Sequence, residues 1–318
     1  MVRAERPDHL QVVHPPVPTI HEGYLWGCEH LAASGSAEAA IEAEVLLRHV
    51  LGLDRAGLYI RWMQSLTEEA WGRYRRLLEE RATGRPVHYI VGQREFMGLP
   101  FTVDERVMIP RPETEGLVEY VIRAAQTADA PLRQGGDRRT VPKADVVVVD
   151  VGTGSGCIAV SVAHYLPEAT VFAIDISEDA LTVARSNAIR HGVDGQIRWL
   201  HGDLLSSLPV DMAGRVDVVA SNPPYVSRGQ REGLPREIRD FEPSGAVFVD
   251  GDGTAVHRRL IADAPTWLAK AGQLVMEVGF GQADAVADAV RQDHRYATVS
   301  IMPDYAGIPR VVAATRQR

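Results

Sequence analysis

The stretch that decides the fold is Asp145-Val146-Val147-Val148-Val149-Asp150-Val151-Gly152-Thr153-Gly154-Ser155-Gly156. Its apolar run predicts a strand over residues 145–150, and a helix is predicted over 157–165. The glycines between them let the backbone turn sharply and approach a ligand, and the start of the helix presents unpaired N–H groups. A strand, a glycine-rich turn and a helix in this order predict a nucleotide-like ligand at the turn.

Strands and helices alternate along the rest of the C-terminal part, which is typical of a parallel α/β sheet. Further strands are predicted at 170–175, 197–200, 216–221 and 273–278, and a second helix at 178–191. The last two predicted strands, 297–302 and 310–314, have no room for a helix between them and should form an edge hairpin with one antiparallel strand. The sequence therefore predicts a Rossmann-like α/β domain with a seven-stranded sheet.

The N-terminal part has a different pattern. Residues 1–18 are rich in proline and charge, and we expect a flexible lead-in. Residues 19–84 carry apolar side chains at three- to four-residue spacing, which predicts a small helical domain. Its third long helix is predicted to begin after Thr67, a residue type suited to the N-cap, and to end before Gly84.

A linker is predicted between the helical and the α/β domain. Short apolar stretches at 87–91 and 99–103 indicate a β-hairpin within residues 85–112. Residues 113–318 then form the α/β domain, in which the polar segment 126–143 is expected to be an exposed loop.

The composition excludes several classes of protein. With 45% hydrophobic and 24% charged residues the chain is an ordinary globular one, and no stretch reaches the roughly 18 apolar residues of a membrane span. The formal net charge of -8 argues against a sequence-independent grip on nucleic acid. Cys28 and Cys157 lie far apart, so neither a disulfide nor a metal site is expected. The N-terminus lacks an apolar signal segment, and we expect a cytoplasmic protein without a membrane partner.

The spacing of the glycines bears on which ligand the turn holds. A dinucleotide site uses G-x-G-x-x-G, whereas this turn is G-x-G-x-G with Asp150 before it. A carboxylate at this point would repel a pyrophosphate but suits the cationic end of S-adenosylmethionine. Asp175 ends the next strand, about 20 residues beyond the glycines, where it can accept both ribose hydroxyls of either cofactor. Asp203 and Leu204 follow the third strand and can meet the adenine amino group and a ring nitrogen.

Together these residues favour S-adenosylmethionine, because ligands of open α/β sheets bind outside the carboxyl ends of the strands. The predicted cofactor-binding residues are Asp150, Gly152, Thr153, Gly154, Ser155, Gly156, Asp175, Asp203, Leu204 and Asn222.

The segment Asn222-Pro223-Pro224-Tyr225 follows the predicted strand 216–221 and lies at the same sheet edge. Two consecutive prolines lack the N–H groups of a ladder, so the strand stops there. The rigid turn suits a planar NH2 group: the Asn222 side-chain oxygen and the Pro223 carbonyl can accept its hydrogens, while Tyr225 stacks on its plane. These four residues are the predicted substrate site, for a nitrogen attached to a π system such as a glutamine side chain or a base amino group.

Seven segments, in order, resemble the release-factor glutamine methyltransferases of the HemK/PrmC type, and the resemblance extends from about residue 35 to 315. The segments are 84–90, 94–96 with 98–101, 109–115, 150–156, 221–225, 241–243 and 304–312. The resemblance implies a class I S-adenosylmethionine-dependent methyltransferase fold, with S-adenosylhomocysteine as product. It implies as acceptor the side-chain amide nitrogen (N5) of the glutamine in the Gly-Gly-Gln motif of peptide-chain release factors, docked by the helical domain. We expect the enzyme to be a monomer.

Three other functions stay open as alternatives: a glutamine methyltransferase acting on a ribosomal protein, a nucleic-acid amino-group methyltransferase, and a non-catalytic binding module. The sequence at 306–310, near the C-terminus, favours a release-factor methyltransferase over one that acts on a ribosomal protein. The acidic balance and the helical N-terminal domain count against the second. The intact glycine turn counts against the third.

Overall fold

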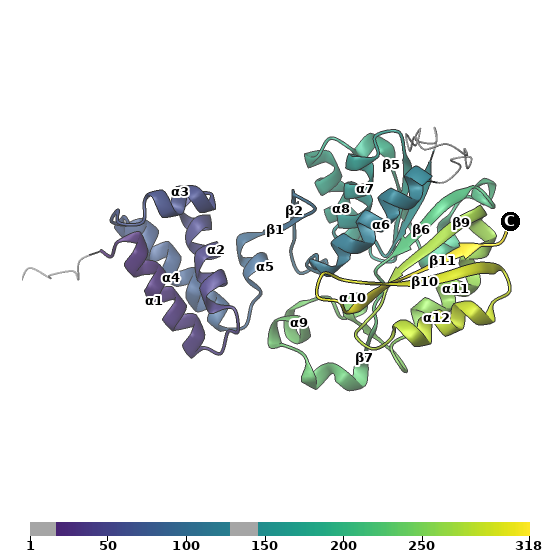
Figure 1. Cartoon of the computed structure of the whole chain (residues 1–318). Coiled ribbons are helices and arrows are strands. Elements are labelled where there is room, and N and C mark those ends of the chain that lie inside the picture. Colours follow the sequence, from purple (N-terminus) through teal and green to yellow (C-terminus); the bar gives the residue numbers. More distant parts are fainter. Residues whose placement is uncertain (1–16, 128–145) are drawn as a thin grey trace, which may run out of the picture. The chain divides into compact units, whose positions relative to one another are not determined.

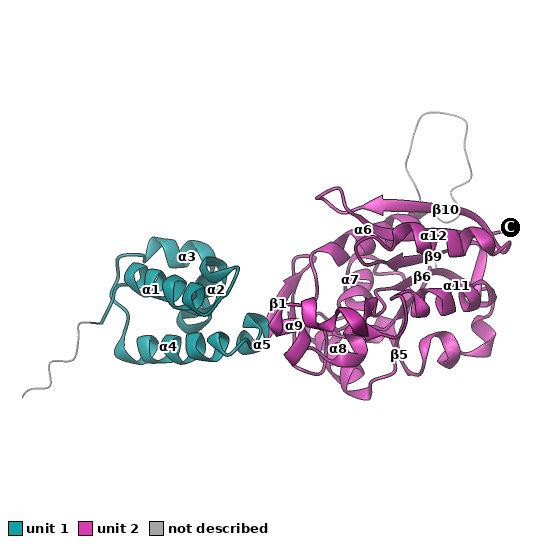
Figure 2. Ribbon diagram, turned by 90° about the horizontal axis from the view of Figure 1, so that it is seen from below, with its two compact units in different colours: residues 1–91 teal, residues 92–318 magenta. Residues whose placement is uncertain are grey.

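The computed structural model describes residues 17–127 and 146–318. The expectations for residues 1–16 of the lead-in and for residues 128–143 of the loop lie outside these described residues. The loop prediction is wrong for Gln126 and Thr127, which are the last two residues of a helix (Glu113–Thr127). The chain divides into two compact units, Met1–Val91 and Gly92–Arg318, which Figure 2 shows in different colours.

Unit 1 is helical, as the sequence predicts. Its helices are α1 (Ile20–Ala33), α2 (Ala39–Leu51), α3 (Arg55–Ile60), α4 (Glu68–Ala82) and α5 (Val87–Val91). The Thr67 hydroxyl accepts a hydrogen bond from the Ala70 N–H, which confirms Thr67 as the N-cap of the third long helix. The core of this unit includes Tyr74, whose hydroxyl donates to the carbonyl of Ala43 over 3.1 Å.

The strand predicted at 87–91 is wrong, because these residues form helix α5. The carbonyl of Pro86 accepts from the N–H groups of Tyr89 and Ile90, and the side chains of Val87 and Tyr89 are buried. A short apolar run fits a buried helix as well as a buried strand. Packing against the helical core decides between them here.

A β-hairpin is present a few residues further along. Strand β1 (Gln93–Phe96) pairs antiparallel with β2 (Leu99–Thr102). The turn residues Met97 and Gly98 both have positive φ, which two-residue hairpin turns of type I′ require. The rings of Phe96 and Phe101 are buried edge to face in the core of unit 2.

Unit 2 is built on a seven-stranded sheet with the order β10-β11-β9-β6-β3-β4-β5 (Figure 1). The strands are β3 (Val147–Val151), β4 (Thr170–Asp175), β5 (Ile197–His201), β6 (Val216–Ser221), β9 (Leu268–Glu277), β10 (Tyr296–Pro303) and β11 (Pro309–Arg316). All seven predicted strands are present. Strand β11 pairs antiparallel with both β9 and β10, so the reversed strand of the predicted edge hairpin lies one place in from the edge.

Helices cover both faces of this sheet. Helices α6 (Glu113–Thr127) and α7 (Cys157–Tyr165) share one core with Val148 and Val218, whereas α11 (Ala255–Trp267) and α12 (Ala283–Gln292) share another with Val149 and Val219. Successive strand residues thus point to opposite, buried faces, which explains why the strands read as continuous apolar runs.

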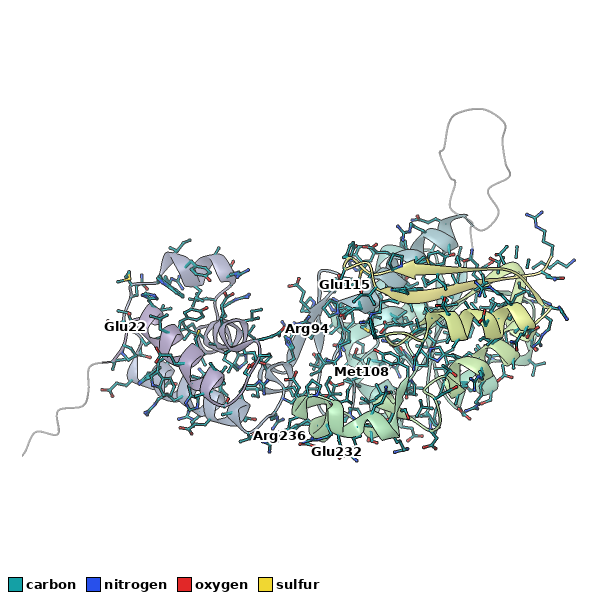
Figure 3. The ribbon with its side chains drawn as sticks, turned by 60° about the horizontal axis from the view of Figure 1, so that its bottom comes forward. Glu22, Arg94, Met108, Glu115, Glu232 and Arg236 are labelled. Atoms are coloured by element: carbon teal, nitrogen blue, oxygen red, sulfur yellow. The ribbon has the colours of Figure 1, made fainter. Side chains whose placement is uncertain are left out.

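Shorter elements complete unit 2. They are α8 (Glu178–Arg190) beside β4 and β5, η1 (Asp194–Gln196), η2 (Leu204–Ser207), η3 (Val210–Met212), β7 (Val226–Ser227), η4 (Arg228–Gly233), α9 (Arg236–Phe241), α10 (Ser244–Val247) and β8 (Phe248–Val249). Strands β7 and β8 form a small parallel sheet, which no apolar pattern in the sequence predicts. Exposed charged side chains, among them Glu232 and Arg236, project from η4 and α9 (Figure 3).

The strand order reverses at β3. Strands β4 and β5 follow on one side of it, and β6 and β9 lie on the other. The parallel register pairs Val151 with Ser221, so the glycine turn after β3 and Asn222 after β6 leave the sheet side by side. Open α/β sheets bind their ligands in the crevice at such a reversal, outside the carboxyl ends of the strands.

Candidate active site

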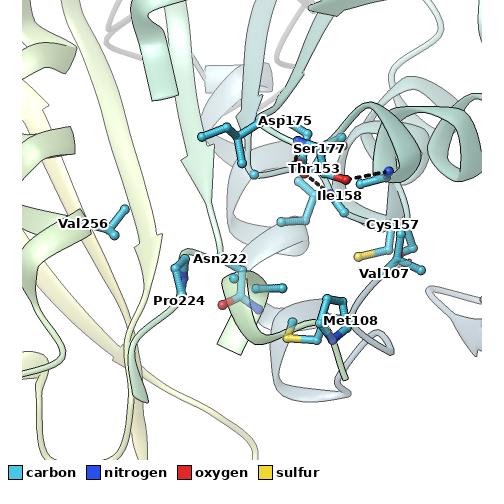
Figure 4. A pocket seen from close by; sticks show the side chains of 18 of the residues that line it. Val107, Met108, Thr153, Cys157, Ile158, Asp175, Ser177, Asn222, Pro224 and Val256 are labelled. Carbon is cyan, nitrogen blue, oxygen red and sulfur yellow. Dashed lines mark hydrogen bonds between the residues drawn. The ribbon is translucent and has the colours of Figure 1, made fainter. Parts of the chain in front are cut away.

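A cavity of about 440 Å³ lies at the carboxyl ends of β3 to β6, a size that suits a small-molecule ligand. Figure 4 shows Asp175 and Thr153 at one side of it, and Asn222 and Met108 at another. The predicted site residues that line it are Gly152, Thr153, Gly154, Ser155, Asp175, Asp203, Leu204, Asn222 and Pro224. Its described lining does not include Asp150, Gly156, Pro223 or Tyr225.

The glycine turn has the backbone conformation that only glycine adopts readily. Gly152, Gly154 and Gly156 have φ of 73°, 53° and 81°. Open space lies where side chains at Gly152 and Gly154 would be, whereas a Cβ at Gly156 would lie 3.0 Å from the Cβ of Ala184. The first two glycines therefore leave room for a ligand, and the third lets α7 pack closely on α8.

Asp150 is fully buried beneath this turn. Its Oδ2 accepts from the Thr153 hydroxyl over 2.6 Å and from the Ala159 N–H over 3.1 Å, and its Oδ1 has no partner among the described residues. Burial raises the pKa of Asp150 to about 7, while the two hydrogen bonds oppose that shift. The carboxyl group thus braces the turn, and its direct contact with a cofactor stays a prediction.

Asp175 and Asp203 approach the cavity from the ends of β4 and β5. The Oδ2 of Asp175 accepts from the Gly154 N–H and its Oδ1 from the Ser177 N–H, each over 2.9 Å. Each oxygen keeps a second lone pair for a ligand hydroxyl. Asp203 pairs through Oδ2 with the Nη2 of Arg259 over 2.6 Å, so a cation that the sequence analysis does not single out adjoins the predicted adenine position.

The Asn222 amide has one end engaged and the other end available. Its Nδ2 donates to the Oγ1 of Thr114 over 3.0 Å. Its Oδ1 is buried and has no partner among the described residues. A buried acceptor without a donor is costly, so this oxygen is suited to a hydrogen bond from a ligand. Pro224 lines the cavity beside Asn222, and Pro223 is buried.

Tyr225 lines a second cavity of about 140 Å³. The described residues around that cavity are Arg111, Glu113, Tyr225, Glu277 and Arg310. The Tyr225 hydroxyl donates to the Oε1 of Glu277 over 3.4 Å, and its carbonyl accepts from the Nε2 of Gln282 over 2.9 Å. A Cβ at Gly279 would lie 2.9 Å from the ring, so that glycine makes room for it. The predicted stacking of Tyr225 on a substrate stays a prediction.

Two residues outside the predicted set, Thr114 and Glu277, belong to the site. Thr114 lines the main cavity from the first turn of α6, and its hydroxyl donates to the Oε2 of Glu277 over 2.6 Å. Glu277 ends β9 at the same sheet edge as Asn222. A single carboxylate inside the apolar run 274–278 is the signal that could have indicated it.

Burial controls the ionisation of two further groups. It raises the pKa of Glu277 to about 7, against the hydrogen bond from Thr114 and the charge of Arg310, while the charge of Glu113 adds to the rise. Burial also raises the pKa of the Cys157 thiol to about 12, so this side chain in the cavity wall is no thiolate at neutral pH.

In the described part of the chain no cluster of His, Cys, Asp and Glu is arranged to hold a metal ion. No described helix has the length and apolarity to cross a membrane.

Two protein-family models match the chain. The PrmC N-terminal domain matches residues 24–92, and the methyltransferase small domain matches residues 138–237. A release factor glutamine methyltransferase of Moorella thermoacetica is 38% identical over 94% of this chain and 99% of the relative. The chain belongs to this family. A release factor glutamine methyltransferase of Bacillus subtilis is 35% identical over 93% of this chain and 97% of that relative's length.

A more distant protein shares the fold of this member of the release factor glutamine methyltransferase family. The crystal structure of the hMettl16 catalytic domain, in complex with the MAT2A 3′UTR hairpin 6, matches with a TM-score of 0.52 at 15% identity. The match covers 75% of this chain and 81% of that one, and it shows a common fold. The chain is thus a class I methyltransferase, as the sequence predicts.

Proposed function

We propose that this enzyme transfers the methyl group of S-adenosylmethionine to the side-chain amide nitrogen (N5) of the glutamine in the Gly-Gly-Gln motif of peptide-chain release factors. The observation that carries the proposal is the buried Oδ1 of Asn222, an acceptor without a partner among the described residues at the wall of the main cavity. A primary amide supplies the N–H donor that this oxygen lacks. Relatives that are 35% and 39% identical are named release factor glutamine methyltransferases.

The residues around the main cavity fit S-adenosylmethionine. Gly152 and Gly154 have left-handed backbone and open space before them, and the oxygens of Asp175 keep lone pairs for ribose hydroxyls. Asp203 and Leu204 line the part of the cavity after β5, where we place the adenine. When bound, this cofactor supplies an electrophilic methyl group on a sulfonium centre.

Asn222 and Pro223 hold the acceptor in this proposal. An amide nitrogen is a poor nucleophile because its lone pair is delocalised over the carbonyl group. When its two hydrogens are donated to the Asn222 oxygen and the Pro223 carbonyl, electron density shifts toward the nitrogen. Both hydrogen bonds strengthen as the nitrogen becomes positive in the transition state, so they lower the barrier by electrostatic stabilisation and positioning. As the new N–CH3 bond forms, the S–CH3 bond breaks to leave S-adenosylhomocysteine, and the nitrogen releases one of its two hydrogens as a proton to solvent.

The partner is a folded protein in this proposal, docked by the helical unit. A single glutamine side chain offers little binding energy, and contacts remote from the reacting atoms can supply what positions it. We further propose that the enzyme is a cytoplasmic monomer that needs no metal and makes no direct contact with nucleic acid or membrane.

The test is the transfer of labelled methyl from S-adenosylmethionine to a purified release factor, compared with the same factor carrying Ala in place of the Gly-Gly-Gln glutamine. We expect label on the unchanged factor alone, located on that glutamine by mass spectrometry. Equal labelling of both factors would contradict the proposal. Ribosomal proteins and RNA are offered in parallel, and label on either in place of the release factor would support that alternative.

A further inference from the structure

Three polar side chains from separate elements form a continuous row beside the main cavity. Asn222 follows β6, Thr114 lies in the first turn of α6, and Glu277 ends β9. The parallel register of β6 and β9 pairs Ser221 with Met276, which places Asn222 and Glu277 at the same level of the sheet edge. The Asn222 Nδ2 donates to the Thr114 Oγ1 over 3.0 Å, and that hydroxyl donates to the Glu277 Oε2 over 2.6 Å.

The row has a single arrangement of hydrogens when Glu277 is charged. A carboxylate only accepts hydrogen bonds, so the one hydroxyl hydrogen of Thr114 points to Glu277. The Thr114 oxygen can then only accept from Asn222, which turns the Nδ2 end of that amide toward Thr114. The Oδ1 end faces elsewhere, and it is the buried atom without a partner among the described residues.

Shape alone does not select this orientation. The two ends of a side-chain amide are nearly the same size, so hydrogen-bond partners decide which end points where. If Thr114 could donate to Asn222, the Oδ1 would be engaged and the Nδ2 presented in its place. The Asn222 NH2 group would then face the NH2 group of the amide that accepts the methyl. Both groups are hydrogen-bond donors, so no hydrogen bond would form between them.

Glu277 is held independently of Thr114. Its Oε1 accepts from the Tyr225 hydroxyl over 3.4 Å, and its main-chain carbonyl accepts from the Nε2 of His257 over 2.8 Å. Arg310 and Glu277 line the same small cavity, so a positive charge lies near the Glu277 carboxyl group. Removal of the Thr114 hydroxyl therefore leaves Glu277 in place and frees the Asn222 amide from its hydrogen bond.

We propose that Thr114 and Glu277 are positioning residues that hold the Asn222 amide with its oxygen toward the methyl acceptor. This inference rests on the proposed function, because it requires an acceptor with N–H groups. The two residues act through Asn222. Since the Asn222 hydrogen bond strengthens as the acceptor nitrogen becomes positive, their loss lowers kcat more than it raises KM.

The test compares Thr114→Val, which removes the hydroxyl and keeps the shape, with Thr114→Ser, which keeps the hydroxyl. For Thr114→Val we expect kcat with a release factor to fall roughly 10- to 100-fold, with KM within about threefold of wild type. The affinity for S-adenosylmethionine, measured by calorimetry, should change little, whereas the Tm should fall by about a few degrees because the Asn222 Nδ2 and the Glu277 Oε2 each lose a hydrogen-bond partner. Thr114→Ser should keep kcat within about threefold of wild type. An unchanged kcat in Thr114→Val would overturn the inference, and so would an equal loss of cofactor affinity, which indicates a structural role.

Glu277→Gln provides a second test. It decides the inference on its own in the case that Thr114→Val does not fold. Its NH2 group can donate to Thr114, which frees the Thr114 hydrogen for Asn222 and permits both orientations of that amide. We expect a kcat reduced by less than in Thr114→Val, with cofactor affinity retained. An unchanged kcat in folded Glu277→Gln would overturn the inference. Failure of the proposed function looks different, because wild type itself would then label no release factor.

Discussion

The hydroxyl of Ser221 donates to the carbonyl of Val151 over 2.8 Å, so a side chain as well as the ladder joins the ends of β6 and β3. Asn222 follows Ser221, and Gly152 follows Val151. The site that we assign to the acceptor and the turn that we assign to the cofactor are therefore fixed to each other where both leave the sheet. Both residues of this pair are buried, so water does not replace the hydrogen bond if it is lost.

Replacing Ser221 by Ala should lower the free energy of unfolding by about 1–3 kcal/mol, because it leaves a buried carbonyl with one donor fewer. Urea denaturation measures this change. Ser186→Ala is the matched control, since its exposed hydroxyl donates to the Thr182 carbonyl over 2.9 Å, and we expect a change within about 0.5 kcal/mol. Equal effects of the two substitutions would contradict the role assigned to Ser221.

Asn222→Ala removes the acceptor that carries the proposed function. We expect kcat to fall at least about 100-fold, as when one stabilising hydrogen bond of a transition state is lost. Cofactor affinity by calorimetry should stay within about threefold, because the glycine turn and Asp175 are untouched. If turnover and cofactor affinity are lost together, Asn222 is structural.

The strands of the sheet, the glycine turn at 152–156 and the end of strand β6 before Asn222 could be predicted, because each depends on local sequence. An apolar run followed by glycines or prolines indicates a strand end, and the helix predicted over 157–165 has these bounds in the structure. The same local reasoning is wrong at 87–91, where the packing of Val87, Ile90 and Val91 in the helical core favours a helix. A run of five apolar or aromatic residues carries too little periodicity to decide this.

The side-chain partners within the site could not be predicted in the same way. Which strand lies beside which is a property of the whole sheet, and only the register of β6 with β9 brings Glu277 to the level of Asn222. Tyr225 shares a four-residue segment with Asn222, yet it lines the smaller cavity. Pro224 and Tyr225 are neighbours in the chain but line different cavities, and sequence spacing does not reveal this.

Gly156→Ala and Gly154→Ala should have different effects, although both place a Cβ on left-handed backbone. At Gly156 the new atom would lie 3.0 Å from the Cβ of Ala184, so we expect a loss of about 2–4 kcal/mol in the free energy of unfolding. At Gly154 there is open space, so we expect about 1–2 kcal/mol from the backbone alone. Cofactor affinity should suffer more at Gly154, where the Cβ enters the cavity. Chemical denaturation and calorimetry measure the two effects, and the opposite ranking in either would contradict this assignment.

The ionisation of Glu277 predicts opposite pH trends for stability and turnover. Burial raises its pKa from 4.5 to about 7, so between these values the folded protein binds a proton that the unfolded chain has lost. The stability contributed by this group is fully present below pH 4.5 and is lost as the pH rises through about 7, with an upper limit on the order of 3 kcal/mol. Turnover should rise over the same interval, because only the charged carboxylate fixes the orientation of Asn222.

Wild type and Glu277→Gln, each measured from pH 5.5 to 8.5, separate this group from its surroundings. The buried Asp150 also has a pKa of about 7, but it is present in both proteins, so the difference between them reports Glu277. The groups that face Glu277 are unchanged as well: Arg111, Glu113, Tyr225, His257 and Arg310. We expect Glu277→Gln to show a flatter decline of unfolding free energy and a flatter rise of kcat than wild type. Parallel curves for the two proteins would show that the charge of Glu277 controls neither property.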